Sequence, residues 1–244
     1  IVPDTTAVVT FPISAMQSVP SVDSMASGSG YALFDTTNNS VSLIAVTTIT
    51  NATMAHIHSG FAGETGGVVV SLMQDASNQG VWMTDGSITL DNATAAQLLS
   101  GGHYVNIHTE AYPNGEIRGQ ITPDNIQVYG ISADGAQEVP AVTTDAMGSG
   151  AFTLNTTTGA LSGTVTISGM TASMAHIHEG IAGVSGGVVI GLEDSTNGMW
   201  SVPANTQLTA GQMATMAAGG FYTNFHSSAF PSGEIRGQIT LGFD

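Results

Sequence analysis

The sequence predicts an all-β protein made of two tandem antiparallel β-sandwich domains with Greek-key-like connections and one short helix each. Three observations predict this fold. The 244-residue chain contains 31 Gly and is 42% hydrophobic. Its apolar residues alternate with polar ones over short segments bounded by turns, which is the period of a strand. A set of motifs occurs twice, about one domain length apart, which is too long a period for a solenoid.

The repeat divides the chain into residues 1–123 and residues 124–244, with a junction near Pro123. The same motifs occur in the same order in both halves, and their offset falls from 120 to 118 residues along the repeat. We therefore expect two similar domains, the second shortened by two residues in its middle. The matched blocks are residues 17–20 with 137–140, 28–30 with 148–150, 63–69 with 183–189, and 115–122 with 233–240.

Each half is expected to hold about seven or eight strands and one helix. In the second half, residues 150–154 and 160–167 alternate on either side of a turn and predict a hairpin. Thr209 and Gln212 have the spacing of a capping box, which predicts a helix there. Its counterpart in the first half is predicted near residues 92–100.

The charge and the absence of Cys exclude several classes of partner and site. The chain has 18 acidic residues, no Lys and two Arg, for a net charge of −16. Nucleic-acid binding needs clustered Lys and Arg, so we expect no nucleic-acid partner. Without Cys there is neither a disulfide nor a thiolate metal site. No apolar run approaches the roughly 20 residues of a membrane-spanning helix, so we expect no membrane span.

Histidines recur at matched positions and are candidate metal ligands. The segment 54–58, Met-Ala-His-Ile-His, returns unchanged as residues 174–178. Alternate side chains of a strand share a face, so both histidines point one way and Ala and Ile the other. The strand after the predicted helix adds a third histidine in the motif Tyr-x-Asn-x-His. The expected ligands are His56, His58 and His108 in the first half, and His176, His178 and His226 in the second.

Three imidazoles from two strands are a donor set for copper, with zinc as the second choice. Neutral imidazole nitrogen binds either metal at about 2 Å, and a fourth position can stay open for water or a small substrate. Ordinary strand histidines without a metal remain the alternative. Met54 and Met174 share the histidine face and are either packing residues or thioether ligands for Cu(I). His103 has no counterpart, since Phe221 stands in its place.

The two arginines, Arg118 and Arg236, are candidate catalytic residues. Each follows the third histidine of its half by ten residues. A structural role is one alternative, in which each pairs with Glu116 or Glu234 or donates to loop carbonyls. The other is a positive charge that draws a small anion towards a metal against the negative field of the protein.

In their order, these motifs resemble the CHRD (chordin) domain family over nearly the whole chain. They read Gln-x-Val-Pro, Gly-x-Gly, His-Ile-His with its Gly-rich loop, Tyr-x-Asn-x-His and Gly-Glu-Ile-Arg-Gly-Gln-Ile. Members are typically exported, which implies a secreted, periplasmic or cell-surface protein. A more distant resemblance to copper-zinc superoxide dismutase implies a sandwich of that type. It also implies copper ligation by the three histidines of each half and anion guidance by Arg118 and Arg236.

Differences from copper-zinc superoxide dismutase limit which of its site residues can be assigned to this sequence. The sequence has no bridging histidine, no zinc-ligand cluster and no Cys pair, so we expect a mononuclear site in each half. The leading hypothesis is an exported protein that binds one copper ion per domain for storage, scavenging or redox chemistry such as superoxide dismutation. Whether it is an enzyme stays open. The alternative is a non-catalytic extracellular adhesion or matrix module that forms homo-oligomers through its strand edges.

Overall fold

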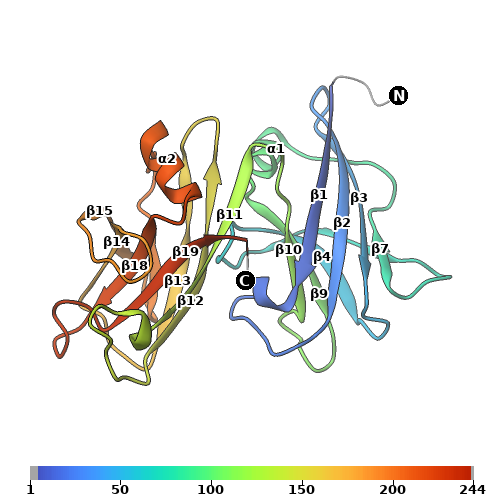
Figure 1. Ribbon diagram of the computed structural model, residues 1–244. Helices are drawn as coiled ribbons and strands as arrows, with labels where there is room; N and C mark the ends of the chain where they lie inside the picture. Colours follow the sequence, from blue (N-terminus) through green and yellow to red (C-terminus); the bar gives the residue numbers. More distant parts are fainter. Residues whose placement is uncertain (1–4, 243–244) are drawn as a thin grey trace. The chain divides into compact units, whose positions relative to one another are not determined.

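The computed structural model describes residues 5–242, which form strands and two short helices. The chain divides between Ile126 and Gln127 into two compact units, called here the first and second domain. Each has its own antiparallel sheet (Figure 1). Each also has its own hydrophobic core. The predicted all-β fold with two similar domains is confirmed.

Hydrogen bonds link the strands of the first domain into one nearly closed sheet in the order β5-β4-β9-β10-β1-β2-β3-β7-β6, with β8 beside β3. The elements are β1 (Thr6–Ser14), η1 (Ala15–Gln17), β2 (Ser27–Asp35), β3 (Ser40–Thr47), β4 (Met54–Ser59), β5 (Val68–Ser71), β6 (Met73–Gln74), β7 (Val81–Met83), β8 (Ile88–Thr89), α1 (Asn92–Leu99), β9 (His103–His108) and β10 (Ile117–Gln120).

The second domain repeats this order position by position as β15-β14-β18-β19-β11-β12-β13-β17-β16. Its elements are β11 (Ile126–Asp134), η2 (Gly135–Gln137), β12 (Met147–Asn155), β13 (Leu161–Ser168), β14 (Met174–Glu179), β15 (Val188–Gly191), β16 (Glu193–Asp194), β17 (Met199–Ser201), α2 (Ala210–Ala217), β18 (Phe221–His226) and β19 (Ile235–Leu241).

Local sequence explains the elements that were expected. Strands β12 and β13 form the predicted hairpin. The side chain of Thr209 caps α2, and Gln212 completes the predicted capping box. In the first domain Asp91 caps α1 by accepting from two backbone N–H groups. Both helices therefore begin where the sequence supplies an N-cap.

Strict alternation places one face of the histidine strands in the core. Ala55 and Ile57 of β4 are 1% and 2% exposed, and Val105 and Ile107 of β9 are fully buried. In the second domain Ala175, Ile177, Thr223 and Phe225 are buried in the same way. The histidines between them must then point away from the core.

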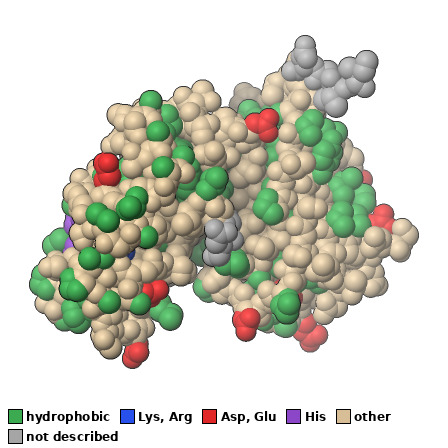
Figure 2. All heavy atoms as spheres, viewed as in Figure 1, with side chains coloured by type: hydrophobic (Ala, Val, Ile, Leu, Met, Phe, Trp, Pro, Cys, Tyr) green, Lys and Arg blue, Asp and Glu red, His purple; other side chains and the backbone are tan. Residues whose placement is uncertain are grey.

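The acidic side chains are spread singly over the face in Figure 2 and do not gather into one patch. Histidine side chains reach that surface at the edge of the second domain where β14 and β15 lie (Figures 1 and 2). Neither α1 nor α2 has the length and hydropathy that a transmembrane helix needs.

Candidate metal centre

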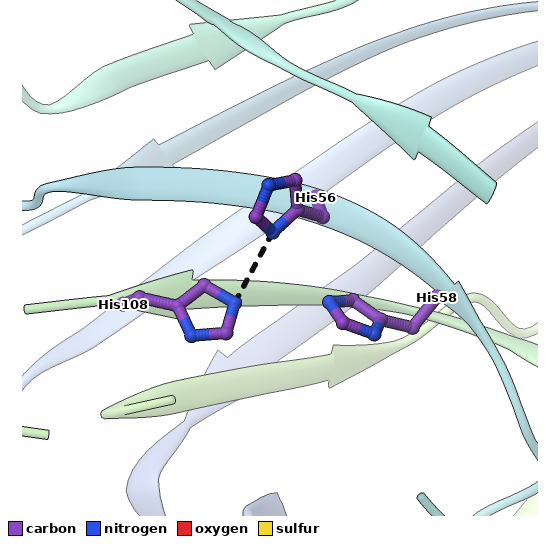
Figure 3. A group of neighbouring side chains, drawn as sticks. All are labelled: His56, His58 and His108. Carbon is purple, nitrogen blue, oxygen red and sulfur yellow. Dashed lines mark hydrogen bonds between the residues drawn. The ribbon is translucent and has the colours of Figure 1, made fainter. Parts of the chain in front are cut away.

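Strand pairing brings the three predicted ligands of the first domain together. Strand β4 pairs with β9 so that Met54 lies opposite His108 and His56 opposite Asn106. The third histidine is therefore diagonal to the His-x-His pair, on the same face of two neighbouring strands. Figure 3 shows the three imidazoles turned towards one another. The second domain repeats this register between β14 and β18.

The ligating nitrogens are close enough to share one ion. In each domain one nitrogen from each of the three histidines lies within 4.8 Å of the other two. Nδ1 of His56 lies 3.3 Å from Nε2 of His108, and Nδ1 of His176 lies 3.1 Å from Nε2 of His226. Metal–nitrogen bonds of about 2.0–2.1 Å in a tetrahedral site separate the nitrogens by roughly 3.3–3.4 Å. The His56–His108 and His176–His226 pairs match this spacing, and with the third histidine within 4.8 Å each group could hold a metal ion.

Backbone carbonyls orient two of the three rings. Nδ1 of His58 lies 2.9 Å from the carbonyl oxygen of Gly66, and Nδ1 of His108 lies 3.0 Å from that of Pro113. A carbonyl only accepts, so each Nδ1 carries the proton and each Nε2 keeps its lone pair. Nε2 of His58 is buried with no hydrogen-bond partner. This is how metal-ligating histidines are held.

The second domain repeats these contacts. Nδ1 of His178 and of His226 each lie 3.0 Å from a carbonyl oxygen, that of Gly186 and of Pro231 respectively. Nε2 of His178 is likewise buried without a partner.

The environment favours the neutral form of four of the six imidazoles. Burial lowers the pKa of His56, and the charge of His58 lowers it further. Burial also lowers the pKa of His108, more than its hydrogen bond to Pro113 raises it. His176 and His226 are shifted in the same direction for the same reasons. Neutral imidazole is the form that binds a metal, so these ligands need not lose a proton near neutral pH.

Loops cover part of the face on which the histidines lie. His108 and His226 are only 6% and 7% exposed, whereas His56 and His176 are partly exposed. Met54 and Met174 are about half exposed, opposite His108 and His226. The site is therefore shielded on one side and reachable past the His-x-His strand.

Arg118 is buried beside this site and holds the loop that carries Gly66. Only 2% exposed, it donates to the carbonyl oxygens of Phe61 and Glu64 and to Oε1 of Gln120. Its guanidinium carbon lies 3.5 Å from the centre of the Tyr104 ring. Burial lowers the pKa of Arg118 to about 10, so it remains a cation at neutral pH.

Arg236 makes the matching contacts with Ile181, Val184, Gln238 and Tyr222. Of the structural roles expected for the arginines, hydrogen bonding to loop carbonyls is present. The carboxylate of Glu116 instead accepts from Ser24 and Thr109, and that of Glu234 from Thr144 and Ser227. Anion guidance by Arg118 and Arg236 stays a prediction.

Tyr104 connects the arginine to a ligand and was not singled out from the sequence. Its ring stacks on His58, with centroids 5.2 Å apart and an angle of 14° between the planes. Its hydroxyl accepts from the backbone N–H of Gly66. Tyr222 does the same for His178 and Gly186. The signal that could have found it is the repeated Tyr-x-Asn-x-His motif, which places Tyr on the face of the third histidine.

His103, the histidine without a counterpart, lies in the core and not in the site. It is 1% exposed, as is Phe221 at the matching position. Neither of its ring nitrogens has a hydrogen-bond partner, and burial lowers its pKa to about 4.

Comparison with known families matches residues 9–121 and residues 129–239 to the CHRD domain. The two matches cover the two repeats in turn. No curated protein and no solved structure matches the chain.

Proposed function

The chain belongs to the CHRD family, with two domains in tandem, and from this premise we propose that each domain binds one copper ion through its three histidines. One observation carries the proposal: three imidazole nitrogens converge within 4.8 Å, and they do so in both domains. Two of the three rings in each domain are oriented by carbonyl oxygens, as ligands of a metal are.

Copper is preferred to zinc because of the donor set. The ligands are imidazole nitrogens, and the chain has no thiolate to offer. Such nitrogen donors bind several divalent metals, and the affinity of a given site is highest for Cu(II) in the first-row series. Zinc remains the second choice, since three histidines and an open position also suit it.

The proposed role is copper storage, scavenging or redox chemistry. When bound, copper supplies one-electron chemistry at a position open to small molecules, and superoxide dismutation is the first such reaction to assay. The protein would favour the neutral form of His56 and His108, fix the tautomers of His58 and His108, and shield one side of the site from water. We place this function outside the cytoplasm, as a secreted, periplasmic or cell-surface protein.

Copper stoichiometry tests the proposal. Metal-free protein titrated with Cu(II) should bind two ions per chain, followed by electron paramagnetic resonance for nitrogen coordination. His56→Ala and His176→Ala should each leave one ion, and the double variant none. His103→Phe is the matched control, since that histidine lies in the core, and should keep both. A chain that takes up neither copper nor zinc would contradict the proposal.

Self-assembly through strand edges is a second candidate, favoured by the strands at one end of each sheet. Strands β5 and β15 end their sheets, and Val68 and Val188 on them are 54% and 58% exposed. An exposed apolar edge strand is a template for pairing with another chain. Sedimentation should then show oligomers that dissociate in the Val68→Lys, Val188→Lys double variant. Wild-type protein that stays monomeric at high concentration would exclude this candidate.

A further inference from the structure

A cavity of about 530 Å³ lies beside the histidine site of the first domain. Its polar lining includes Ser18, His58, Asn106 and Arg118. Pro20, Val22, Ala111, Tyr112 and Pro113 add an apolar wall. The cavity thus joins apolar side chains to converging polar groups, a combination that small-molecule sites use for affinity and orientation.

The second domain has a carboxylate at the matching place. Ser18 corresponds to Glu138, which is only 9% exposed. A Cβ atom on Gly233 would lie 2.6 Å from Oε1 of Glu138 and 2.4 Å from Oδ1 of Asn224. The carboxylate thus packs against Gly233 and Asn224, and its Oε1 is buried there without a hydrogen-bond partner. Their counterparts, Gly115 and Asn106, both line the cavity of the first domain.

The groups that favour the charge on Glu138 are also present around the cavity. Burial raises the pKa of Glu138, while the charge of Arg236, the backbone N–H of Val139 and the Asn224 amide act in the opposite direction. The equivalent residues are Arg118, Val19 and Asn106, and all three line the cavity. Burial outweighs these groups, so the pKa of Glu138 is raised overall. The first domain has the same three groups around its cavity, while its own residue there is the short Ser18.

The charge of the buried arginine is the largest of the effects that favour an anion at this position. Arg118 makes its side-chain hydrogen bonds to uncharged oxygens. Glu64, which favours the charged form of Arg118, lies in the Gly-rich loop, where the second domain has Val184. In the second domain it is Glu138 that favours the charged form of Arg236. The acid near the arginine thus comes from a different loop in each domain. In the first domain the position of Glu138 is taken by Ser18, so none of the described residues places a carboxylate there.

We propose that the first domain binds a small carboxylate with an apolar or aromatic body in this cavity, its carboxylate taking the place that Glu138 has in the second domain. The carboxylate would lie against Val19, Asn106 and Arg118, and the body of the ligand against Tyr112 and Pro113. None of those five residues is a candidate metal ligand, but Pro113 and Arg118 also support His108 and His58, so the test uses the metal-free chain.

Titration of the metal-free 244-residue chain with benzoate tests the proposal. Calorimetry or NMR should show one site per chain with a Kd of about 1 mM or lower. Benzamide, which has the shape without the charge, should bind at least about tenfold more weakly. Since no metal is present, failure of the copper proposal would leave this result unchanged.

Variants at the two matched positions identify the site. Ser18→Glu should abolish benzoate binding, because the new side chain would place its own carboxylate in the proposed site. Ser18→Ala leaves the site empty and should retain binding. Glu138→Ser should create a second site. Unfolding curves show which variants are folded, and Ser18→Gln repeats the blocking test without adding charge. The proposal is overturned if wild-type protein binds no benzoate, if folded Ser18→Glu or Ser18→Gln binds it as wild type does, or if folded Glu138→Ser gains no site.

Discussion

The guanidinium of Arg118 covers the ring of Tyr104 at 3.5 Å. The strand of Tyr104 lies between those of Arg118 and His58, and its ring also stacks on the imidazole of His58. Arg118 reaches the same histidine by a second path, because it holds the loop whose Gly66 carbonyl accepts from Nδ1 of His58. Arg118 is not a candidate ligand, but it positions the candidate ligand His58 through both Tyr104 and the loop of Gly66.

Replacing Arg118 by Lys should therefore weaken copper binding in the first domain. An ammonium group cannot reproduce the planar fork that donates to Phe61, Glu64 and Gln120. Loss of such support around a metal ligand typically costs about 10–100-fold in affinity. Each hydrogen bond to the charged guanidinium that is lost costs roughly 1.5–3 kcal/mol of unfolding free energy. Competition titration and urea unfolding measure the two effects.

Arg236→Lys is the matched variant and should act on the second site alone. If Arg118→Lys left affinity and stability unchanged but slowed a reaction with superoxide, the arginine would guide anions rather than position His58. That outcome would contradict the positioning role.

Gly66→Ala should also weaken the first site, whereas Gly67→Ala should not. A Cβ atom on Gly66 would lie within 1.9 Å of the carbonyl oxygen of Ser59, so the loop must move away from His58. A Cβ atom on Gly67 would have no other atom within 4 Å. We expect about a tenfold loss of copper affinity for the first variant only. Equal effects of the two substitutions would show that the Gly66 carbonyl does not orient the ligand.

Acid should release the metal and destabilise the metal-free protein. The pKa values of His56, His108, His176 and His226 are lowered from 6.5 in the folded state. Below pH 6.5 the unfolded chain then binds more protons than the folded chain, so the free energy of unfolding decreases as the pH falls. Protons also compete with copper for the same nitrogens. Urea unfolding and copper titration between pH 8 and pH 5 check both trends, and an affinity that rises on acidification would contradict them.

His103→Phe should stabilise the first domain. The imidazole is buried with two unpartnered nitrogens, which costs about 1–3 kcal/mol, and the second domain accommodates Phe221 at this position. Its pKa of about 4, against 6.5 when exposed, also removes roughly 3 kcal/mol of stability between pH 6.5 and pH 4. Thermal unfolding should show a higher Tm and a weaker acid dependence. Phe221→His should do the reverse, and a lower Tm for His103→Phe would refute this account.

Much of the fold and the candidate ligand set could be predicted because both follow from alternation. The spacing of His56 and His58 on a strand fixes their common face, and the repeat shows that His108 and His226 belong with them. The caps of the helices are also local signals. Such features need only the period of the chain and the preferences of neighbouring residues.

The support of the site could not be predicted in this way. The carbonyls of Gly66 and Pro113 carry no side-chain signal, and their contacts depend on loops folding back over the sheet. The contacts of Arg118 span 54 and 57 residues of sequence. Ser18 and Glu138 stand inside otherwise matching motifs. The sequence alone does not show that this difference lies in a cavity lined by Asn106 and Arg118.

The exchange between Glu64 and Glu138 bears on how the two copies diverged after duplication. Each copy places one carboxylate near its buried guanidinium, but one supplies it from the Gly-rich loop and the other from the turn after the short 3-10 helix. Each guanidinium thus has one nearby carboxylate, but the sequence position that supplies this carboxylate differs between the two domains. Such divergence changes the lining beside one guanidinium without altering the histidine triads, which is a route by which one copy of a duplicated domain can acquire its own specificity.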